Sequence, residues 1–335
     1  MNRFYSTCAA GLEQIADSLA AATVRSYTSH RVLTGALLYD AAEDLPRLPV
    51  FQNTYLVLAE YRANDGMDKA ALRVLRDRQA LQNAQTAIKT RRFGSFRYMF
   101  SDQNKLASVN GGTRAQLEKA VSGARVDRVS PDTELLILRR SEGLILFLLR
   151  LTRRDGTEKT LARGELSPAV ASCMAHLCAP EKNGVFCDPF SGHGAIAQAR
   201  LKMCGVKKMY LSDTDPEMIR AMQQKRALTK PPVEINLWDA LRLSDYIPEN
   251  SVTELATDPP WGLFSPLPEP APAFYGKMLA QFSRVLAPGG RFCILTADKP
   301  SFEEAAALCA SLSFGPRIDL LVNGKKAALY HGAKE

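Results

Sequence analysis

The sequence predicts an α/β protein whose C-terminal half forms an open, mainly parallel sheet covered by helices on both faces. Three observations support this fold class. Between residues 185 and 296, apolar runs of strand length alternate with stretches of helical character. Polar turn residues end these runs, and one strand end is followed by a glycine-rich turn. The N-terminal half mixes strands and helices without strict alternation, which indicates a separate α+β region.

The length and composition limit the possible classes of protein. A chain of 335 residues is long enough for two domains or three small modules. No apolar run approaches the roughly 18 residues of a membrane span, and the first residues do not resemble a signal peptide. The seven cysteines include no C-x-x-C pair, which favours reduced core thiols and no metal site. We therefore expect a soluble, cytoplasmic monomer without a bound metal.

Charge is distributed unevenly along the chain. Residues 1–170 contain 25 Lys and Arg against 18 Asp and Glu, a net charge of +7. Residues 171–335 contain 18 against 17, a net charge of +1. A positive field over the N-terminal half would attract a polyanion and hold it near a nearly neutral second half. The alternative interpretation is a basic protein with no such partner.

The most informative stretch runs from Val185 to Ile196. An apolar strand ends at Asp188, and Gly192 and Gly194 open the helix that follows. Such a turn is typical of a nucleotide-like ligand site, because glycines let the backbone approach the ligand and a helix start presents unpaired N–H groups. The stretch also fits the G-x-G-x-x-G/A dinucleotide pattern, with Asp213 as the ribose ligand. A nicotinamide dehydrogenase therefore stays open at this point.

A second carboxylate-proline turn, Asp258-Pro259-Pro260-Trp261, follows the strand predicted at residues 252–257. A hydride-transfer enzyme has no evident need for this second turn. An enzyme that binds a flat base with an exocyclic amine needs such a turn. The lone pair of such an amine is delocalised into the ring, so the enzyme must supply positioning and acceptors more than a strong base. The Asp258 side chain and the Pro259 carbonyl can accept from the amine, and Trp261 can stack on the base.

Together these stretches resemble class I S-adenosylmethionine-dependent methyltransferases that modify amino groups of nucleobases. The combination of Asp-Pro-Phe-Ser-Gly-His-Gly-Ala-Ile with Asp-Pro-Pro-Trp-Gly looks most like the RNA guanine-N2 methyltransferases that carry a THUMP domain. The entry Arg163-Gly-Glu-Leu-Ser-Pro168 is similar to the R-x-x-L-x-P segment of that family. The resemblance implies a Rossmann-like seven-stranded methyltransferase domain over residues 165–335, with S-adenosylmethionine as cofactor and a tRNA guanosine as substrate.

The resemblance leaves alternatives open. Many guanine-N2 family members continue with a basic residue after the second motif, whereas this chain continues with Gly262-Leu263. A ribosomal RNA guanine-N2 methyltransferase and an adenine-N6 methyltransferase of DNA or RNA therefore stay possible. A further alternative is an RNA-binding protein whose second domain holds the cofactor without catalysis.

The predicted site residues lie where the strands of such a sheet end. The resemblance implies that Asp188 holds the amino group of the cofactor, that Asp213, or alternatively Asp215, accepts from the ribose hydroxyls, and that Asp239 accepts from the adenine amine. Singly, each carboxylate would be read as a helix cap or turn residue. The predicted cofactor-binding set is Asp188, Phe190, Ser191, Gly192, His193, Gly194, Asp213, Asp239 and Ala240. The predicted catalytic set is Asp258, Pro259, Pro260 and Trp261.

The N-terminal half resembles the RNA-binding region of the same family. Residues 1–62, with strands expected at 3–8, 32–39 and 53–60, look like its ferredoxin-like module. Residues 63–164 look like a THUMP domain that ends in a linker at 152–164. Within it, cations interleave with aromatics between residues 89 and 98, which suits phosphate contact and base stacking or, alternatively, a solvated face beside a core strand. The predicted RNA-binding residues are Lys89, Arg91, Arg92 and Arg97.

Overall fold

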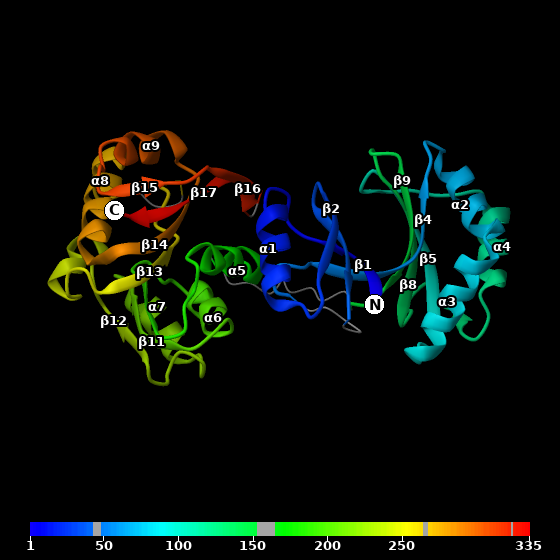
Figure 1. Cartoon of the computed structure of the whole chain (residues 1–335), viewed down its shortest axis with the longest axis horizontal. Helices are drawn as coiled ribbons and strands as arrows, with labels where there is room; N and C mark the ends of the chain where they lie inside the picture. Colours follow the sequence, from blue (N-terminus) through cyan, green and yellow to red (C-terminus); the bar gives the residue numbers. More distant parts are fainter. Residues whose placement is uncertain (43–47, 153–164, 264–266, 323) are drawn as a thin grey trace. The chain divides into compact units, whose positions relative to one another are not determined.

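The computed structural model describes the chain except residues 43–47, 153–164, 264–266 and 323. It forms two compact units (Figure 1). The N-terminal unit comprises residues 1–7 and 20–155, and the C-terminal unit comprises residues 8–19 and 156–335. None of the helices in the described part of the chain is long and apolar enough to cross a membrane. The predicted linker at 152–164 lies almost wholly outside the described residues.

The N-terminal unit is built on one nine-stranded sheet in the order β2-β3-β1-β4-β9-β8-β5-β6, with β7 beside β5, counted over the described residues. Strand β4 pairs with β1 on one side and with β9 on the other, so the sheet is continuous across residue 62, where the sequence suggests a module boundary. The strands are β1 Asn2–Thr7, β2 Thr28–Leu33, β3 Ala36–Ala41, β4 Asn53–Arg62, β5 Ser95–Asp102, β6 Lys105–Leu106, β7 Arg125–Val126, β8 Thr133–Arg139 and β9 Leu144–Arg150.

Three helices cover one face of this sheet: α2 Met67–Arg76, α3 Arg78–Thr90 and α4 Gly111–Ala120 (Figure 1). Their apolar faces and the inward residues of β5 form a core in which Phe96, Tyr98 and Phe100 are buried. Helix α3 begins at Asp77, whose side chain accepts from the Ala80 N–H (3.0 Å). The alternation that the sequence suggests for residues 96, 98 and 100 thus places these rings in the core.

The single strand expected at residues 32–39 is wrong. The segment is a hairpin in which Leu33 of β2 pairs with Ala36 of β3. Gly35 takes a positive φ of 72° at the turn, a conformation that a side chain disfavours. Because the residues on both sides of this turn are apolar, the hydrophobicity pattern alone does not reveal it.

The C-terminal unit contains a mixed sheet in the order β12-β11-β10-β13-β14-β17-β15, with β16 paired to β17. The first five strands of this order are parallel, and β17 runs antiparallel to β14. The chain proceeds outward from β10 to β12 and then returns to β13 on the other side, so strand order reverses between β10 and β13. The strands are β10 Gly184–Asp188, β11 Val206–Ser212, β12 Val233–Asn236, β13 Val252–Thr257, β14 Leu286–Thr296, β15 Leu312–Phe314, β16 Ile318–Val322 and β17 Lys325–Lys334.

Helices surround this second sheet. Ser167 caps α5 by accepting from the Val170 N–H, with Pro168 in the first turn, as the sequence predicts. The fully buried Arg200 of α6 pairs with Glu254 of β13 (Nη2 to Oε1, 2.9 Å), which ties the helix after the glycine turn to a central strand. The helices are α1 Glu13–Thr23, whose first residues belong to this unit, α5 Pro168–Leu177, α6 Ala195–Leu201, α7 Pro216–Gln223, the 3-10 helix η2 Ala240–Asp245, α8 Ala271–Val285 and α9 Lys299–Ala307.

Two turn predictions near the C-terminus had different outcomes. The predicted final hairpin is confirmed: β16 and β17 pair antiparallel up to Val322 opposite Lys325. Residues 288–290, expected as the turn before a strand at 291–296, are included in the longer strand β14, but they interrupt its pairing, and Gly289 has a positive φ of 74°. They form a bulge there, since Val252 pairs with Leu286 while Glu254 pairs with Arg291. A Cβ on Gly290 would lie 2.9 Å from the Val252 carbonyl oxygen, so the bulge requires glycine.

Candidate active site

Four carboxylates gather at one edge of the C-terminal sheet. Asp188 ends β10, Asp213 follows β11, Asp239 follows β12 and Asp258 follows β13. These four strands are parallel neighbours, so their carboxyl ends lie on the same edge. Strand order reverses between β10 and β13, and ligands of open α/β sheets bind at such a reversal. The fold thus brings together the residues predicted for the cofactor and those predicted for catalysis.

Asp188 is a buried carboxylate with one oxygen unsatisfied. Its side chain is 1% exposed, and its Oδ1 accepts a hydrogen bond from the Thr257 hydroxyl (2.8 Å). Within the described residues, Oδ2 is buried and has no hydrogen-bond partner. Burial raises the pKa of Asp188 to about 8, although the bond from Thr257 acts in the opposite direction. A buried acceptor without a donor is costly, so this oxygen fits a ligand that brings an N–H group.

Asp213 is fixed against the glycine turn. Its Oδ2 accepts from the Gly192 N–H (2.9 Å) and its Oδ1 accepts from the Asp215 N–H (2.9 Å). Asp215 instead caps α7, where its side chain accepts from the Glu217 N–H (2.8 Å). These two bonds hold the Asp213 carboxylate beside the glycine turn, whereas the bond to Asp215 comes from the first turn of its own helix. This geometry favours Asp213 over Asp215 as the acceptor for a ribose.

The two glycines of the turn have different roles. Gly192 (φ 49°) has open space where a Cβ would point, which leaves its backbone accessible to a ligand. Gly194 (φ 72°) would place a Cβ 2.6 Å from the Leu228 side chain, so its small size serves helix packing. Between them, the His193 carbonyl accepts a hydrogen bond from the Lys225 ammonium group (2.7 Å). The contact of Lys225 with this turn cannot be predicted from the sequence, because only the fold brings Lys225 to the turn.

Asp239 and its neighbours continue the edge. Asp239 caps η2 by accepting from the Leu241 N–H (2.9 Å), while Ala240 is buried. Trp238 stacks on Tyr246, with ring centroids 4.9 Å apart. Only one Asp239 oxygen has this capping bond, so the other is available to a ligand amine. The structure shows the capping role of Asp239, and its ligand role stays a prediction.

The loop after β13 has a contact at Trp261 that the sequence does not suggest. The indole N–H of Trp261 donates to Asp258 Oδ1 (2.9 Å), so the indole lies beside the carboxylate, and its stacking on a base stays a prediction. Burial raises the pKa of Asp258 to about 7, while the bond from Trp261 lowers it. Pro259 is buried and Pro260 is exposed, which leaves the turn stiff on its inner side. Asp258 is thus a carboxylate with a pKa near neutrality, and its contact with Trp261 uses Oδ1 alone.

The predicted RNA-binding residues lie on the N-terminal unit. Arg91, Arg92 and Arg97 line a hollow of about 1110 Å³, together with Phe93. Lys89 is exposed in the last turn of α3. In the described part of the chain, no carboxylate lies within ion-pair distance of Lys89, Arg91 or Arg92. Their charges are therefore uncompensated and open to a polyanion.

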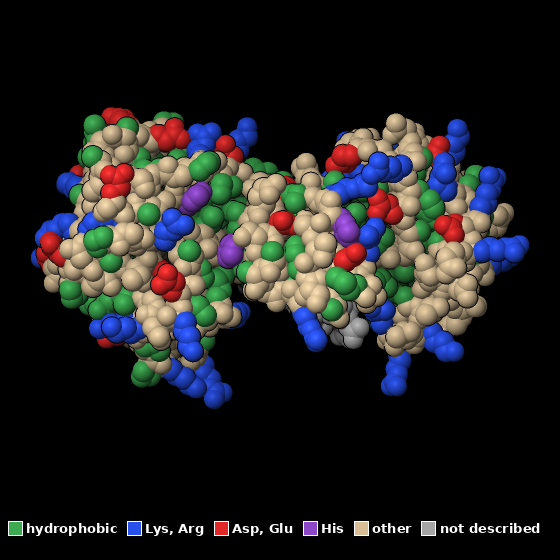
Figure 2. Space-filling view, viewed as in Figure 1, with side chains coloured by type: hydrophobic (Ala, Val, Ile, Leu, Met, Phe, Trp, Pro, Cys, Tyr) green, Lys and Arg blue, Asp and Glu red, His purple; other side chains and the backbone are tan. Residues whose placement is uncertain are grey.

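Arg97 differs from the other three cations. It pairs with Glu134 and also donates to the Arg128 carbonyl (3.3 Å). Arg150 meets the same carboxylate from the other side (2.9 Å). The guanidinium group of Arg97 is therefore used to hold β5 against its neighbours. On the face drawn in Figure 2, Lys and Arg side chains are spread over both units, so total charge alone does not locate an interface.

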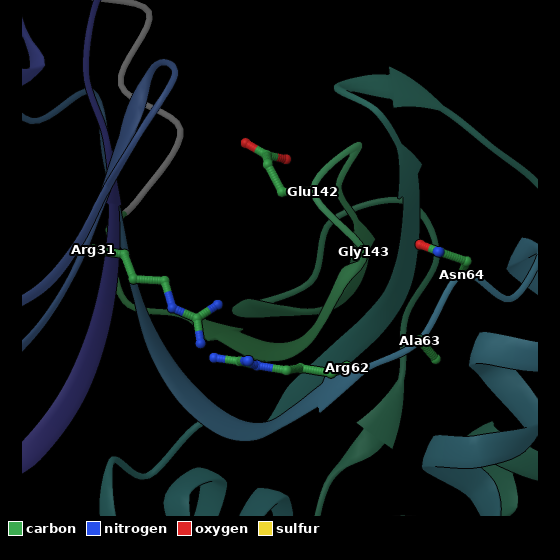
Figure 3. A pocket seen from close by; sticks show the side chains of 6 residues that line it. All are labelled: Arg31, Arg62, Ala63, Asn64, Glu142 and Gly143. Carbon is green, nitrogen blue, oxygen red and sulfur yellow. The ribbon is translucent and has the colours of Figure 1, made fainter.

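A second hollow of the N-terminal unit is nearly balanced in charge. It measures about 590 Å³, and in Figure 3 the side chains of Arg31 and Arg62 point toward one another across it. Arg31 pairs with Glu60 (2.9 Å). The hydrogen bond from Arg140 lowers the pKa of Glu142, which also lines this hollow, to about 2, so this carboxylate is charged at neutral pH. The hollow beside Arg91 also contains two carboxylates, Asp132 and Glu134, but its four arginines give it the larger positive excess.

The fold and this site define a methyltransferase of the Rossmann-like type. Residues 156–314 match the family model described as UPF0020: RMKL-like, methyltransferase domain. This match, with the glycine turn and the strand-end carboxylates, makes the chain an S-adenosylmethionine-dependent methyltransferase. S-adenosylmethionine is its cofactor, and the buried unpaired oxygen of Asp188 fits the amino group of that molecule.

Solved structures share the architecture over the whole chain. The chain is similar to TrmN from Thermus thermophilus (TM-score 0.76, 21% identity, 100% of both chains covered). It is also similar to a possible methylase from Clostridium difficile 630 (TM-score 0.73, 14% identity) and to SMU.472 complexed with SAH (TM-score 0.67, 14% identity), each covering 100% of this chain and 98% of the other. At these identities the likeness establishes the fold. The comparison with curated proteins finds no match.

Proposed function

We propose that the protein methylates the exocyclic N2 amine of a guanosine in RNA, with tRNA as the expected RNA. The observation that carries the proposal is Asp258, which presents a free carboxylate oxygen from a proline-stiffened loop at the same sheet edge as the glycine turn. An acceptor of this kind suits an amine that must be oriented rather than strongly activated. The uncompensated cations of the N-terminal unit supply the attraction for a polyanion.

The cofactor site is assigned to the edge residues. The Asp188 oxygen without a partner accepts from the cofactor amino group, Asp213 accepts from the ribose hydroxyls, and Asp239 accepts from the adenine amine. Phe190, Ser191, His193 and Ala240 complete the lining that the sequence suggests. When bound, S-adenosylmethionine supplies a methyl group activated by its sulfonium. The protein's contribution is to hold the acceptor amine in line with that methyl group.

Asp258 and the Pro259 carbonyl carry out this orientation. Both accept from the amine N–H groups, which turns the nitrogen lone pair toward the methyl group. The bond between nitrogen and methyl carbon forms as the bond between carbon and sulfur breaks, and the nitrogen then loses one proton. Asp258, with its pKa raised to about 7, is suited to accept that proton. Trp261 fixes the carboxylate through its indole N–H and offers its ring to the base.

The hollow beside Arg91 is the proposed RNA interface, and it yields a prediction. Replacing Arg91 and Arg92 together with alanine weakens RNA binding similarly for all sequences. The plot of log affinity against log salt becomes shallower by about 0.7 to 0.9 for each phosphate that the variant no longer neutralises. Fluorescence anisotropy at several salt concentrations measures both effects. The matched control is Arg62→Ala, which removes an arginine of the same unit from the hollow in Figure 3. An unchanged salt slope in the double variant would refute the interface.

Methyl-labelled S-adenosylmethionine tests the substrate class. The wild-type protein is incubated with unmodified tRNA, ribosomal RNA and DNA in parallel, and label is expected in tRNA. Label in ribosomal RNA would keep the chemistry and change the RNA, whereas label in DNA alone would overturn the RNA assignment. No label in any pool would favour an RNA-binding protein that holds the cofactor without catalysis. The run Gly262-Leu263 after the catalytic motif keeps an adenine-N6 acceptor as the second candidate.

A further inference from the structure

Thr257 connects the two halves of the candidate active site. It is the last residue of β13 and immediately precedes Asp258. Its side chain is fully buried, and its hydroxyl forms two hydrogen bonds to the segment that begins the glycine turn. It donates to Asp188 Oδ1 (2.8 Å) and accepts from the Phe190 N–H (3.2 Å). One hydroxyl therefore joins the end of β10, on the cofactor side, to the residue before the proposed catalytic carboxylate.

We propose that Thr257 is a positioning residue for methyl transfer, whose hydroxyl sets the register between the cofactor turn and the catalytic loop. The proposal rests on the function proposed above. Asp188 and Asp258 stand at the ends of two neighbouring parallel strands. In the described part of the chain, the Thr257 hydroxyl is the side-chain group that hydrogen-bonds to both Asp188 and the Phe190 backbone. A shift of about 1 Å between donor and acceptor is enough to cost about a hundredfold in rate.

The chemistry of the contact requires a hydroxyl. Asp188 needs a donor for Oδ1 and the Phe190 N–H needs an acceptor, and one hydroxyl meets both needs because it donates one proton and keeps lone pairs. Valine has nearly the same shape but meets neither. It would leave Asp188, already unpaired at Oδ2, without its remaining side-chain donor. The carboxylate would then be held less firmly, with the Phe190 backbone as its other hydrogen-bond partner.

The same strand offers a matched control. Thr253 lies at the opposite end of β13, and its hydroxyl also bridges to β10, accepting from the Val185 N–H (2.9 Å) and donating to the Val185 carbonyl (3.3 Å). Thr253→Val thus removes the same chemical group between the same two strands, away from the site. Thr257→Ser keeps the hydroxyl and removes only a methyl group. The three variants separate the effect on the site from the effect on strand stability.

The experiment measures kcat, KM for the nucleic acid, the S-adenosylmethionine dissociation constant and the thermal midpoint for each full-length variant. Thr257→Val is expected to lower kcat about ten- to a hundredfold and to weaken cofactor binding, with little change in KM. Thr257→Ser restores most of kcat, and Thr253→Val leaves kcat near wild type whatever thermal stability it loses.

Two outcomes would overturn the proposal. In the first, Thr257→Val and Thr253→Val lower kcat and cofactor affinity equally, in step with their thermal midpoints. In the second, Thr257→Val behaves as wild type in both. If the wild-type protein labels no nucleic acid, the proposed function fails, but the affinity for S-adenosylmethionine still tests the positioning role of Thr257. In that case, equal affinity of Thr257→Val and Thr253→Val for S-adenosylmethionine refutes the role of Thr257.

Discussion

Replacing Asp258 with alanine is expected to lower kcat by about a hundredfold or more, the usual cost of losing one preorganised group that acts on the reacting atoms. The variant keeps the glycine turn and its carboxylates, so S-adenosylmethionine binding stays within about twofold of wild type. Both quantities are accessible from single-turnover methyl transfer and calorimetric titration. Alanine also leaves the Trp261 indole N–H without its acceptor, which costs roughly 1–3 kcal/mol if that group stays buried.

Asp258→Asn removes the titrating charge of this residue and keeps its contact with Trp261. The amide oxygen still accepts from the indole N–H, whereas the amide nitrogen in place of Oδ2 cannot accept from the substrate amine, and neither atom titrates. Only ionised Asp258 can take a proton, so wild-type kcat/KM should fall as pH drops through about 7, the value to which burial raises the pKa of this carboxyl. The asparagine variant should keep part of the activity and lose this acidic limb. An unchanged limb in the variant, or full activity of Asp258→Ala, would contradict the assigned role.

The second large effect is expected on cofactor affinity. Replacing Asp213 with alanine removes the proposed acceptor of the ribose hydroxyls and should raise the S-adenosylmethionine dissociation constant about tenfold to a hundredfold. This range follows from roughly 1.5–3 kcal/mol for hydrogen bonds to a charged group. The Gly192 N–H also loses its partner, so the glycine turn becomes less ordered. Calorimetric titration with the cofactor measures the change.

Asp215→Ala is the matched control for this prediction. Asp215 lies two residues away and caps α7, so its loss should cost about 0.5–2 kcal/mol of stability. It should leave the cofactor dissociation constant nearly unchanged. Weaker cofactor binding in Asp215→Ala than in Asp213→Ala would reverse the assignment of the two carboxylates.

The strands that build the site are readable from the sequence for a physical reason. Parallel strands buried on both faces tend to appear as apolar runs, as Val185-Phe186-Cys187 does in β10. β13 has the predicted bounds, Val252–Thr257, although three of its six residues are polar. A carboxylate directly after such a run must lie at the carboxyl edge of the sheet. The positions of Asp188 and Asp258 at that edge therefore follow from local pattern alone.

Other features depend on which distant residues meet, and no local pattern encodes them. The hydrogen bonds of Thr257 to the Asp188–Phe190 segment join residues nearly seventy positions apart through the register of two strands. Lys225 reaches the His193 carbonyl only after α7 has packed. The hydrogen bond from Trp261 to Asp258 is local, but the stacking role expected for Trp261 does not predict that its indole N–H donates to this carboxylate. The ion pair of Arg97 is likewise not evident from the sequence, because Glu134 comes next to Arg97 only through the pairing of β5 with β8.

The central claim is tested most directly by identifying the methylated nucleoside. Unmodified tRNA is incubated with the protein and methyl-labelled S-adenosylmethionine, digested to nucleosides and analysed by mass spectrometry, with Asp258→Ala in parallel. The account predicts labelled N2-methylguanosine from the wild-type protein and little or none from the variant. Labelled methyladenosine would keep the fold and cofactor but contradict the guanine assignment. Equal labelling by Asp258→Ala would contradict the catalytic role of the second motif.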